Sequence, residues 1–132
     1  LQSATQSLCE HFFGELVPLA VGDNPSMAKK PEADMVNEAL CRLNRSRANA
    51  VYVGDSEVDI ETAKNSRMKL IMVEWGFRKR ADMEKLGAGC FIDKPEKIFD
   101  ILKATPEYPR RAEADNRILQ LLRDEKYIQR KG

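Results

Sequence analysis

The sequence contains no apolar run approaching the ~18 residues of a membrane-spanning helix, and it shows no signal peptide. It also lacks an excess of one charge, because its formal net charge is only +1. A nearly neutral chain has no long-range field that would attract nucleic acid or an anionic membrane. Cysteine is scarce and odd in number (Cys9, Cys41 and Cys90), which indicates free thiols rather than a disulfide framework. We therefore expect a cytoplasmic protein without nucleic-acid or membrane partners.

What remains is the composition of a globular protein. The chain has 132 residues, of which 42% are hydrophobic and 33% charged, enough for one domain with a core. It begins at Leu1 and not at a methionine, so we expect it to be processed, trimmed or part of a longer protein.

Helix-like and strand-like segments alternate along the first hundred residues. This alternation predicts an α/β fold, a Rossmann-like, doubly wound parallel sheet with helices on its faces. Strands are expected at 16–21, 51–53, 69–74 and 90–92, and helices at 1–13, from Pro31 to about 43, at 60–68, 81–86 and 94–102. Gly14 and Gly87 follow two of these helices as caps.

Residues 105–132 differ from the rest of the chain. Pro106 and Pro109 interrupt it, and the following segment is dense in charge with interspersed leucine and isoleucine. We predict two parts: a core over 1–104 and an appended, amphipathic helical tail over 105–132. Such a tail either docks on its own domain or serves association with a partner or a second copy.

The most informative stretch runs from Ala50 to Ile60, where an apolar strand ends in Gly54-Asp55 and a helix follows. Asp59 comes four residues after Asp55, so the two acids share a face at the carboxyl end of the strand. One explanation is a hard divalent cation such as Mg²⁺ held by both carboxylates. The alternative is that Asp55 caps the helix and Asp59 is a solvated acid in its first turn. The spacing alone leaves both open.

Three elements in order carry a family resemblance: Lys30-Pro31-Glu32, Gly54-Asp55-Ser56-Glu57-Val58-Asp59, and Val73-Glu74-Trp75-Gly76-Phe77. Together they resemble the haloacid dehalogenase superfamily, and within it the phosphoglycolate phosphatase-like members. The resemblance covers about residues 8–102. It favours the metal interpretation of Asp55 over the helix cap.

The resemblance implies a role for each matching residue. Lys30 would bind the phosphoryl group as a catalytic residue, and Asp55 would be both a catalytic residue and a Mg²⁺ ligand. Asp59 would support the metal as a further ligand or through its waters. Ser56 would lie beside the site, or would simply be a helix-terminus hydroxyl. Trp75-Gly76-Phe77 would lie on the side of the family's cap domain.

The function implied by the resemblance is Mg²⁺-dependent hydrolysis of a small phosphate monoester such as 2-phosphoglycolate, through an aspartyl-phosphate. The sequence departs from the family, however, because it contains no Asp-x-Asp-x-Thr nucleophile element and no cap insertion. We expect the C-terminal half of a hydrolase that is not competent alone by the family mechanism. The alternatives are a truncated, non-catalytic relative with a phosphate-binding, metal-binding or protein-interaction role, and a phosphomutase-type phosphotransferase.

Two further expectations follow from the same comparison. Arg67 stands where the family ends this helix with glycine, so it must adopt a left-handed conformation unless the helix ends differently. In the family sheet, two strands lie between those expected at 16–21 and 51–53, and they are absent here. A gap of about 10 Å would expose strand edges, which favours low stability, re-pairing or a homo-oligomer.

Overall fold

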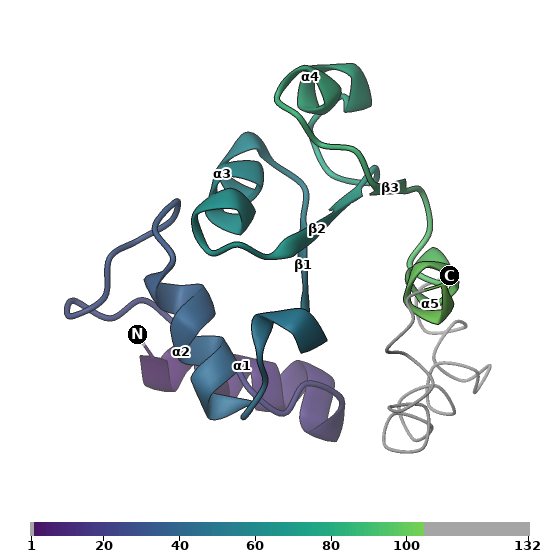
Figure 1. The fold of residues 1–132 in the computed structure, drawn as a ribbon. Coiled ribbons are helices and arrows are strands. Elements are labelled where there is room, and N and C mark those ends of the chain that lie inside the picture. The colour runs from purple at the N-terminus through teal and green to yellow at the C-terminus, as the bar shows by residue number, and fades with distance from the viewer. Residues whose placement is uncertain (1, 105–132) are drawn as a thin grey trace. The chain divides into compact units, whose positions relative to one another are not determined.

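A computed structural model describes residues 2–104 of the chain (Figure 1). The chain divides into two units, Leu1–Lys97 and Ile98–Gly132. The first unit contains α1 (Gln2–Phe13), η1 (Gly14–Leu16), α2 (Asp34–Arg42), η2 (Arg47–Asn49), β1 (Val51–Gly54), α3 (Glu57–Asn65), β2 (Lys69–Val73), α4 (Arg80–Lys85) and β3 (Phe91–Ile92). The helix α5 (Lys97–Lys103) begins at the last residue of the first unit and continues in the second. The predicted tail at 105–132 lies outside the described residues.

The three strands form a parallel sheet in the order β1-β2-β3. Val53 pairs with Ile71, and Met72 pairs with Phe91. Between β1 and β2 the chain passes through α3, which packs on both strands, as Figure 1 shows. Parallel strands are usually covered on both faces, and β2 has the most buried apolar residues of this sheet. The predicted α/β fold is confirmed as an incomplete parallel core.

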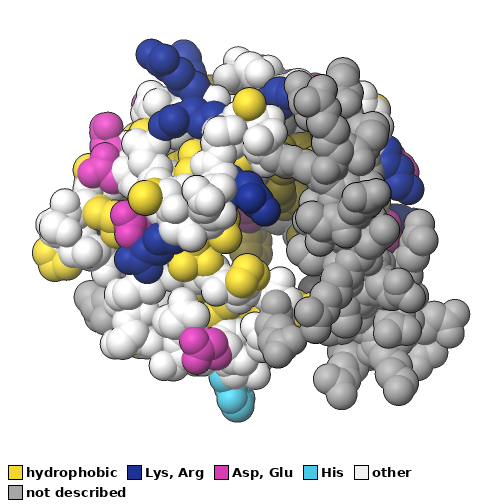
Figure 2. All heavy atoms as spheres, turned by 60° about the horizontal axis from the view of Figure 1, so that its bottom comes forward, with side chains coloured by type: hydrophobic (Ala, Val, Ile, Leu, Met, Phe, Trp, Pro, Cys, Tyr) yellow, Lys and Arg dark blue, Asp and Glu magenta, His cyan; other side chains and the backbone are white. Residues whose placement is uncertain are grey.

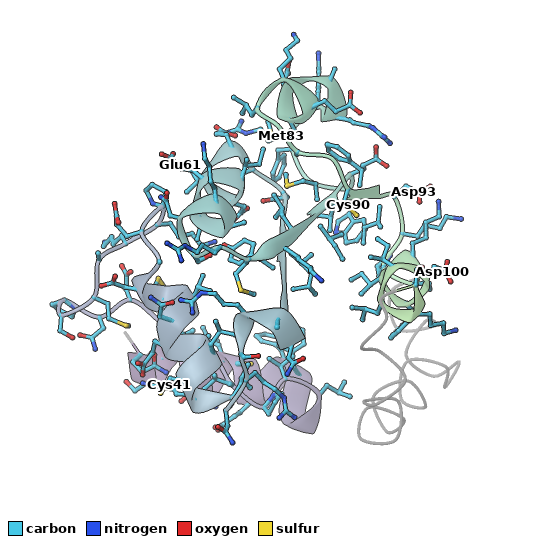
Figure 3. The ribbon with its side chains drawn as sticks, viewed as in Figure 1. Cys41, Glu61, Met83, Cys90, Asp93 and Asp100 are labelled. Atoms are coloured by element: carbon cyan, nitrogen blue, oxygen red, sulfur yellow. The ribbon has the colours of Figure 1, made fainter. Side chains whose placement is uncertain are left out.

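The core of the sheet lies along β2. Met72 is 1% exposed and packs with Met83 and Ala88, while Ile60 and Phe91 border the same cluster. Met83 comes from α4, and Figure 3 labels it there. Burying a side chain of this size contributes about 1.5–3 kcal/mol. This packing holds the carboxyl ends of β1 and β2 in place.

The strand predicted at 16–21 is wrong. Its backbone lies beside α1 without pairing to any described strand. Side chains of α1 satisfy part of it instead: the Gln2 amide donates to the carbonyl of Ala20 (2.8 Å) and accepts from the amide of Gly22 (2.6 Å). The Gln6 side chain accepts from the amide of Ala20 (3.2 Å). A strand requires a backbone partner, and glutamine amides take that place here.

The helix predicted to open at Pro31 begins three residues later, at Asp34. The chain first makes a turn, closed by a hydrogen bond from the Glu32 amide to the Lys29 carbonyl (3.0 Å). The Asp34 carboxylate then accepts from the amide of Ala28 (3.0 Å), which fixes the loop ahead of the helix. The segment that carries Lys30 is therefore a folded loop and not the first turn of α2.

Apolar side chains remain exposed on α1. Leu8, Phe12 and Phe13 are each at least half exposed. In Figure 2, where the bottom of Figure 1 comes forward, apolar atoms break the surface among charged ones, and the chain's single histidine, His11, marks α1. No described helix is long and apolar enough to cross a bilayer.

The cysteines are free thiols, as predicted. Figure 3 shows Cys41 on α2 and Cys90 next to β3, on separate elements of the first unit. Gly14 and Gly87 have φ values of 55° and 97°, which confirms their predicted place at helix ends.

The end of α3 carries the predicted strain at Arg67, whose φ is 57°. The amide of Met68 donates to the carbonyl of Ala63 (2.8 Å) and that of Arg67 to Lys64 (3.1 Å), which together form a Schellman motif. The left-handed region costs a residue with a Cβ about 1–2 kcal/mol. The motif therefore forms at a position where glycine would be strain-free.

We expect Arg67→Gly to stabilise the chain by about 1 kcal/mol, because it removes this strain and the Arg67 side chain is exposed. The measurement is the urea midpoint of the variant. Arg67→Ala is the matched control, since it removes the guanidinium and keeps the Cβ; it should bring no gain. An equal gain in both variants would assign the effect to charge and not to the backbone.

Candidate active site

The site is built where β1 turns into α3. Ser56 is the N-cap of α3: its hydroxyl accepts from the amide of Asp59, and the Asp59 carboxylate accepts from the amide of Ser56. This reciprocal pair is a capping box, which satisfies amides at the helix start. The cap is thus Ser56, and not Asp55 as the alternative interpretation held. Asp59 lies in the first turn of the helix, as predicted.

The carboxylate of Asp59 is the centre of the hydrogen-bond network. Its Oδ1 accepts from the ammonium of Lys30 (2.8 Å) and the hydroxyl of Tyr52 (2.9 Å). Its Oδ2 accepts from the amides of Asp55 (3.0 Å) and Ser56 (3.2 Å) and from the Ser56 hydroxyl (2.9 Å). The Asp59 side chain is only 8% exposed, so burial is compensated by five donors.

These contacts shift three pKa values. Burial raises the pKa of Asp59, but the donors from Lys30, the Asp55 amide, Tyr52 and Ser56 outweigh it and hold that pKa well below its usual range. Burial lowers the pKa of Lys30, and the bonds with Asp59 and Tyr52 raise it above its usual value. Burial and Asp59 together raise the pKa of Tyr52. At neutral pH the network is a carboxylate, an ammonium and a neutral phenol.

Gly54 allows this arrangement by lacking a side chain. A Cβ added there would lie 2.3 Å from the Cβ of Asp59 and 2.6 Å from its Cγ, far inside van der Waals contact. The backbone of Gly54 does not adopt a left-handed conformation. Glycine is therefore required here by the close approach of the first turn of α3, and not by a left-handed backbone conformation.

Lys30 reaches the site from the loop ahead of α2. The side chain of Asn65, at the end of α3, donates to the carbonyl of Pro31 (2.9 Å) and ties this loop to the helix. The Lys30 side chain is 45% exposed, and its ammonium lies 5.5 Å from the centroid of the Tyr52 ring. Its neighbour Lys29 instead pairs with Asp23 at the surface (2.9 Å). The fold thus distinguishes the two adjacent lysines.

The position and surroundings of Asp55 suit a ligand of a metal ion. It follows the carboxyl end of β1, is half-buried, and its carboxylate forms no hydrogen bond or ion pair with another residue among 2–104. Mg²⁺ commonly takes one or two carboxylates together with waters and phosphate oxygens. Asp55 is therefore available as one such ligand.

Asp59 does not fit the part of a direct ligand, because its two oxygens already accept five hydrogen bonds. The positive charge that relieves repulsion between the two acids is the ammonium of Lys30. Within residues 2–104, no three histidine, cysteine, aspartate or glutamate side chains gather as a metal cluster. Figure 3 shows Glu61 on α3 and Asp93 after β3, well apart. A support of the metal by Asp59 through water stays a prediction.

Two residues of the site were missed from the sequence. Tyr52 is the one aromatic residue in the strand ending at Gly54. A tyrosine among aliphatic neighbours is the signal that could have indicated a hydroxyl with a polar partner. Gly76 was noted only for the resemblance, yet a Cβ there would lie 2.7 Å from the Cβ of Asp55. Neither contact follows from sequence spacing, because Tyr52 joins β1 to α3 and Gly76 joins the loop after β2 to the loop after β1.

Asp59→Asn should destabilise the chain by about 2–3 kcal/mol, because the amide cannot accept from all five donors. Lys30→Met should cost about 1 kcal/mol, since its partner keeps four donors and the lysine is partly solvated. Lys29→Met is the matched control; it breaks an exposed pair and should change the unfolding free energy by less than about 0.5 kcal/mol. Urea unfolding measures all three. Equal effects at Lys29 and Lys30 would contradict the assigned network.

The pKa of Asp59 also predicts a pH dependence of stability. The folded-state pKa lies below the unfolded one, so the folded chain binds fewer protons. This contribution is fully present above the unfolded pKa of about 4 and is lost as the pH falls below it. Urea midpoints measured from pH 7 to pH 3 should fall more steeply for the wild type than for Asp59→Asn. Parallel curves would show that Asp59 titrates normally.

Comparison with known proteins identifies the family of the chain. A family model described as haloacid dehalogenase-like hydrolase matches residues 2–73. The phosphoglycolate phosphatase of Rhodobacter capsulatus is 39% identical over 61 residues, which cover 46% of this chain and 27% of that protein. A provisionally named pyrophosphatase of Caldanaerobacter subterraneus subsp. tengcongensis is 31% identical over 87 residues, 66% of this chain and 40% of the relative.

A solved structure is similar as well. The crystal structure provisionally assigned as a phosphoglycolate phosphatase from Lactobacillus delbrueckii subsp. bulgaricus superposes with a TM-score of 0.69 at 40% identity. The match covers 74% of this chain and 41% of that one. The chain thus spans less than half the length of each of these relatives. Because the family model matches more than half of its residues, the chain belongs to the haloacid dehalogenase-like hydrolases.

Proposed function

We propose that this chain is the phosphate- and metal-binding portion of a phosphatase that hydrolyses a small phosphate monoester such as 2-phosphoglycolate. The observation that carries the proposal is the ammonium of Lys30, held 2.8 Å from Asp59 at the sheet edge where the carboxylate of Asp55 has no partner among residues 2–104. The substrate class is taken from relatives that carry the name phosphoglycolate phosphatase. Another relative carries the provisional name of a pyrophosphatase.

Lys30 supplies a fixed positive charge. An ammonium has three donors, and Asp59 takes one of those of Lys30. Because nearly half of the side chain is exposed, the remaining donors can bind a phosphoryl oxygen. Its raised pKa keeps the group charged at neutral pH. A preorganised cation stabilises the charge that develops as the phosphoryl group moves between oxygens.

Asp55 would hold Mg²⁺ through its carboxylate. The ion would neutralise charge on the phosphate. Asp59 acts on the site through its neighbours: it orients Lys30 and Tyr52 and fixes the amides at the start of α3. Ser56 contributes the helix cap that keeps Asp59 in place.

A non-catalytic role is the second candidate, and one observation favours it. The sequence contains no Asp-x-Asp-x-Thr element, so these residues do not supply the family's nucleophile. Phosphate or metal binding without turnover, or a phosphotransferase completed by other residues, uses the same Lys30 and Asp55. Association through the tail at 105–132 or through a sheet edge belongs to this second candidate. The coding sequence upstream of Leu1 separates the candidates, since an in-frame nucleophile element supports the hydrolase.

In the protein at the length its gene encodes, Asp55→Asn should lower Mg²⁺-dependent phosphate release from 2-phosphoglycolate or p-nitrophenyl phosphate by about 10²-fold or more. Lys30→Met should do the same, while Asp23→Asn, which touches only the surface pair, should leave turnover unchanged. The readout is inorganic phosphate with and without EDTA. Full turnover in Asp55→Asn removes that residue from the site. Phosphate binding without turnover in the wild type supports the non-catalytic candidate.

A further inference from the structure

The loop after β2 packs directly on the side chain of Asp55. A Cβ added at Gly76 would lie 2.7 Å from the Cβ of Asp55, 2.7 Å from its Oδ2 and 3.1 Å from its Cγ. Real Cβ atoms essentially never approach others below 3.0 Å. The backbone of Gly76 is not left-handed, so its own conformation does not call for glycine. Residue 76 must therefore be glycine because the Asp55 side chain occupies the space that a Cβ would need.

The same loop is fastened to the helix that starts beside Asp55. Arg78 donates from Nε to Glu57 Oε2 (2.7 Å) and from Nη2 to Glu57 Oε1 (2.8 Å). Two parallel bonds between a guanidinium and a carboxylate define direction as well as distance. Glu57 is the first residue of α3 and stands two positions after Asp55. The bidentate pair therefore holds the loop over the site.

The two acids of the site are thus oriented by different means. Asp59 is oriented by five hydrogen bonds, whereas no hydrogen bond or ion pair within residues 2–104 constrains the carboxylate of Asp55. What limits Asp55 is contact with the backbone of Gly76. We propose that Gly76 is a positioning residue for Asp55, with the Arg78–Glu57 pair as its clamp. This inference rests on the proposed function, in which Asp55 is a metal ligand.

A methyl group at Gly76 cannot be accommodated by rotating the Asp55 side chain. Rotation moves Oδ2 but leaves the Cβ of Asp55 where it is, and the closest contact includes that Cβ. Either the loop or the end of β1 must shift. Displacing a ligand in this way resembles the loss of a supporting residue at a metal site, which lowers metal affinity by about 10–100-fold.

The chain carries its own probe for this site. Trp75 precedes Gly76 and is the only tryptophan among the 132 residues. Tb³⁺ binds oxygen ligands as other hard cations do, and its luminescence is sensitised by a nearby excited indole. Titrating the chain with Tb³⁺ under tryptophan excitation, with Mg²⁺ as competitor, therefore reports binding at Asp55 independently of turnover.

We expect wild type to give a saturable, Mg²⁺-sensitive signal, and Gly76→Ala to shift its midpoint to at least about tenfold higher Tb³⁺. Gly89→Ala is the matched control, because a Cβ there meets no heavy atom within 4 Å; its midpoint should equal that of wild type. Circular dichroism on heating verifies that each variant is folded. A Gly76→Ala midpoint equal to wild type, alongside loss of signal in Asp55→Asn, overturns the role of Gly76 and leaves the proposed metal ligand intact.

Two further variants keep the test decisive. Should Gly76→Ala fail to fold, Arg78→Gln loosens the same loop without adding atoms, and Arg42→Gln, which breaks an exposed pair on α2, is its control. Arg78→Gln should weaken Tb³⁺ binding severalfold and Arg42→Gln should not; equal midpoints overturn the clamp and the positioning role together. An unchanged signal in Asp55→Asn, by contrast, overturns the metal ligand of the proposed function itself.

Discussion

The buried carboxylate of Asp59 is the interaction on which this site depends. It connects three elements of the fold: the loop with Lys30, the strand with Tyr52 and the first turn of α3. A buried carboxylate is costly without partners, so its five donors are a condition for this packing. The same donors leave it little capacity for a direct bond to a metal ion.

Asp59 and Asp55 therefore have different roles in the site. Asp59 accepts the hydrogen bond that orients Lys30, whereas the carboxylate of Asp55, at the strand end, has no partner in the part of the chain that the structure describes. The four-residue spacing places both acids at the carboxyl end of the strand, as the sequence predicted. Their roles differ because only Asp59 belongs to the capping box of α3. The charge that relieves their repulsion comes from a lysine, within the chain.

Much of this was predictable from local patterns. The strands at 51–53 and 69–74, the glycine ends of two helices and the strain at Arg67 follow from apolar runs and backbone preferences. The strand prediction at 16–21 was wrong because an apolar run cannot show whether a neighbouring strand is present to pair with it. The contacts that Gly54 and Tyr52 make with Asp59 were missed. Both contacts join β1 to the first turn of α3, and residue spacing does not specify how that helix lies on the strand.

The glutamines of α1 illustrate how a helix can stand in for a strand. One side-chain amide carries a donor and an acceptor, as a peptide group does. Gln2 bonds to both the carbonyl of Ala20 and the amide of Gly22, and Gln6, one helical turn later, accepts from the amide of Ala20. The two glutamines thus satisfy three backbone groups of this segment. Asparagine, one methylene shorter, would not bridge the same separation, so the length of the side chain sets the spacing of this layer.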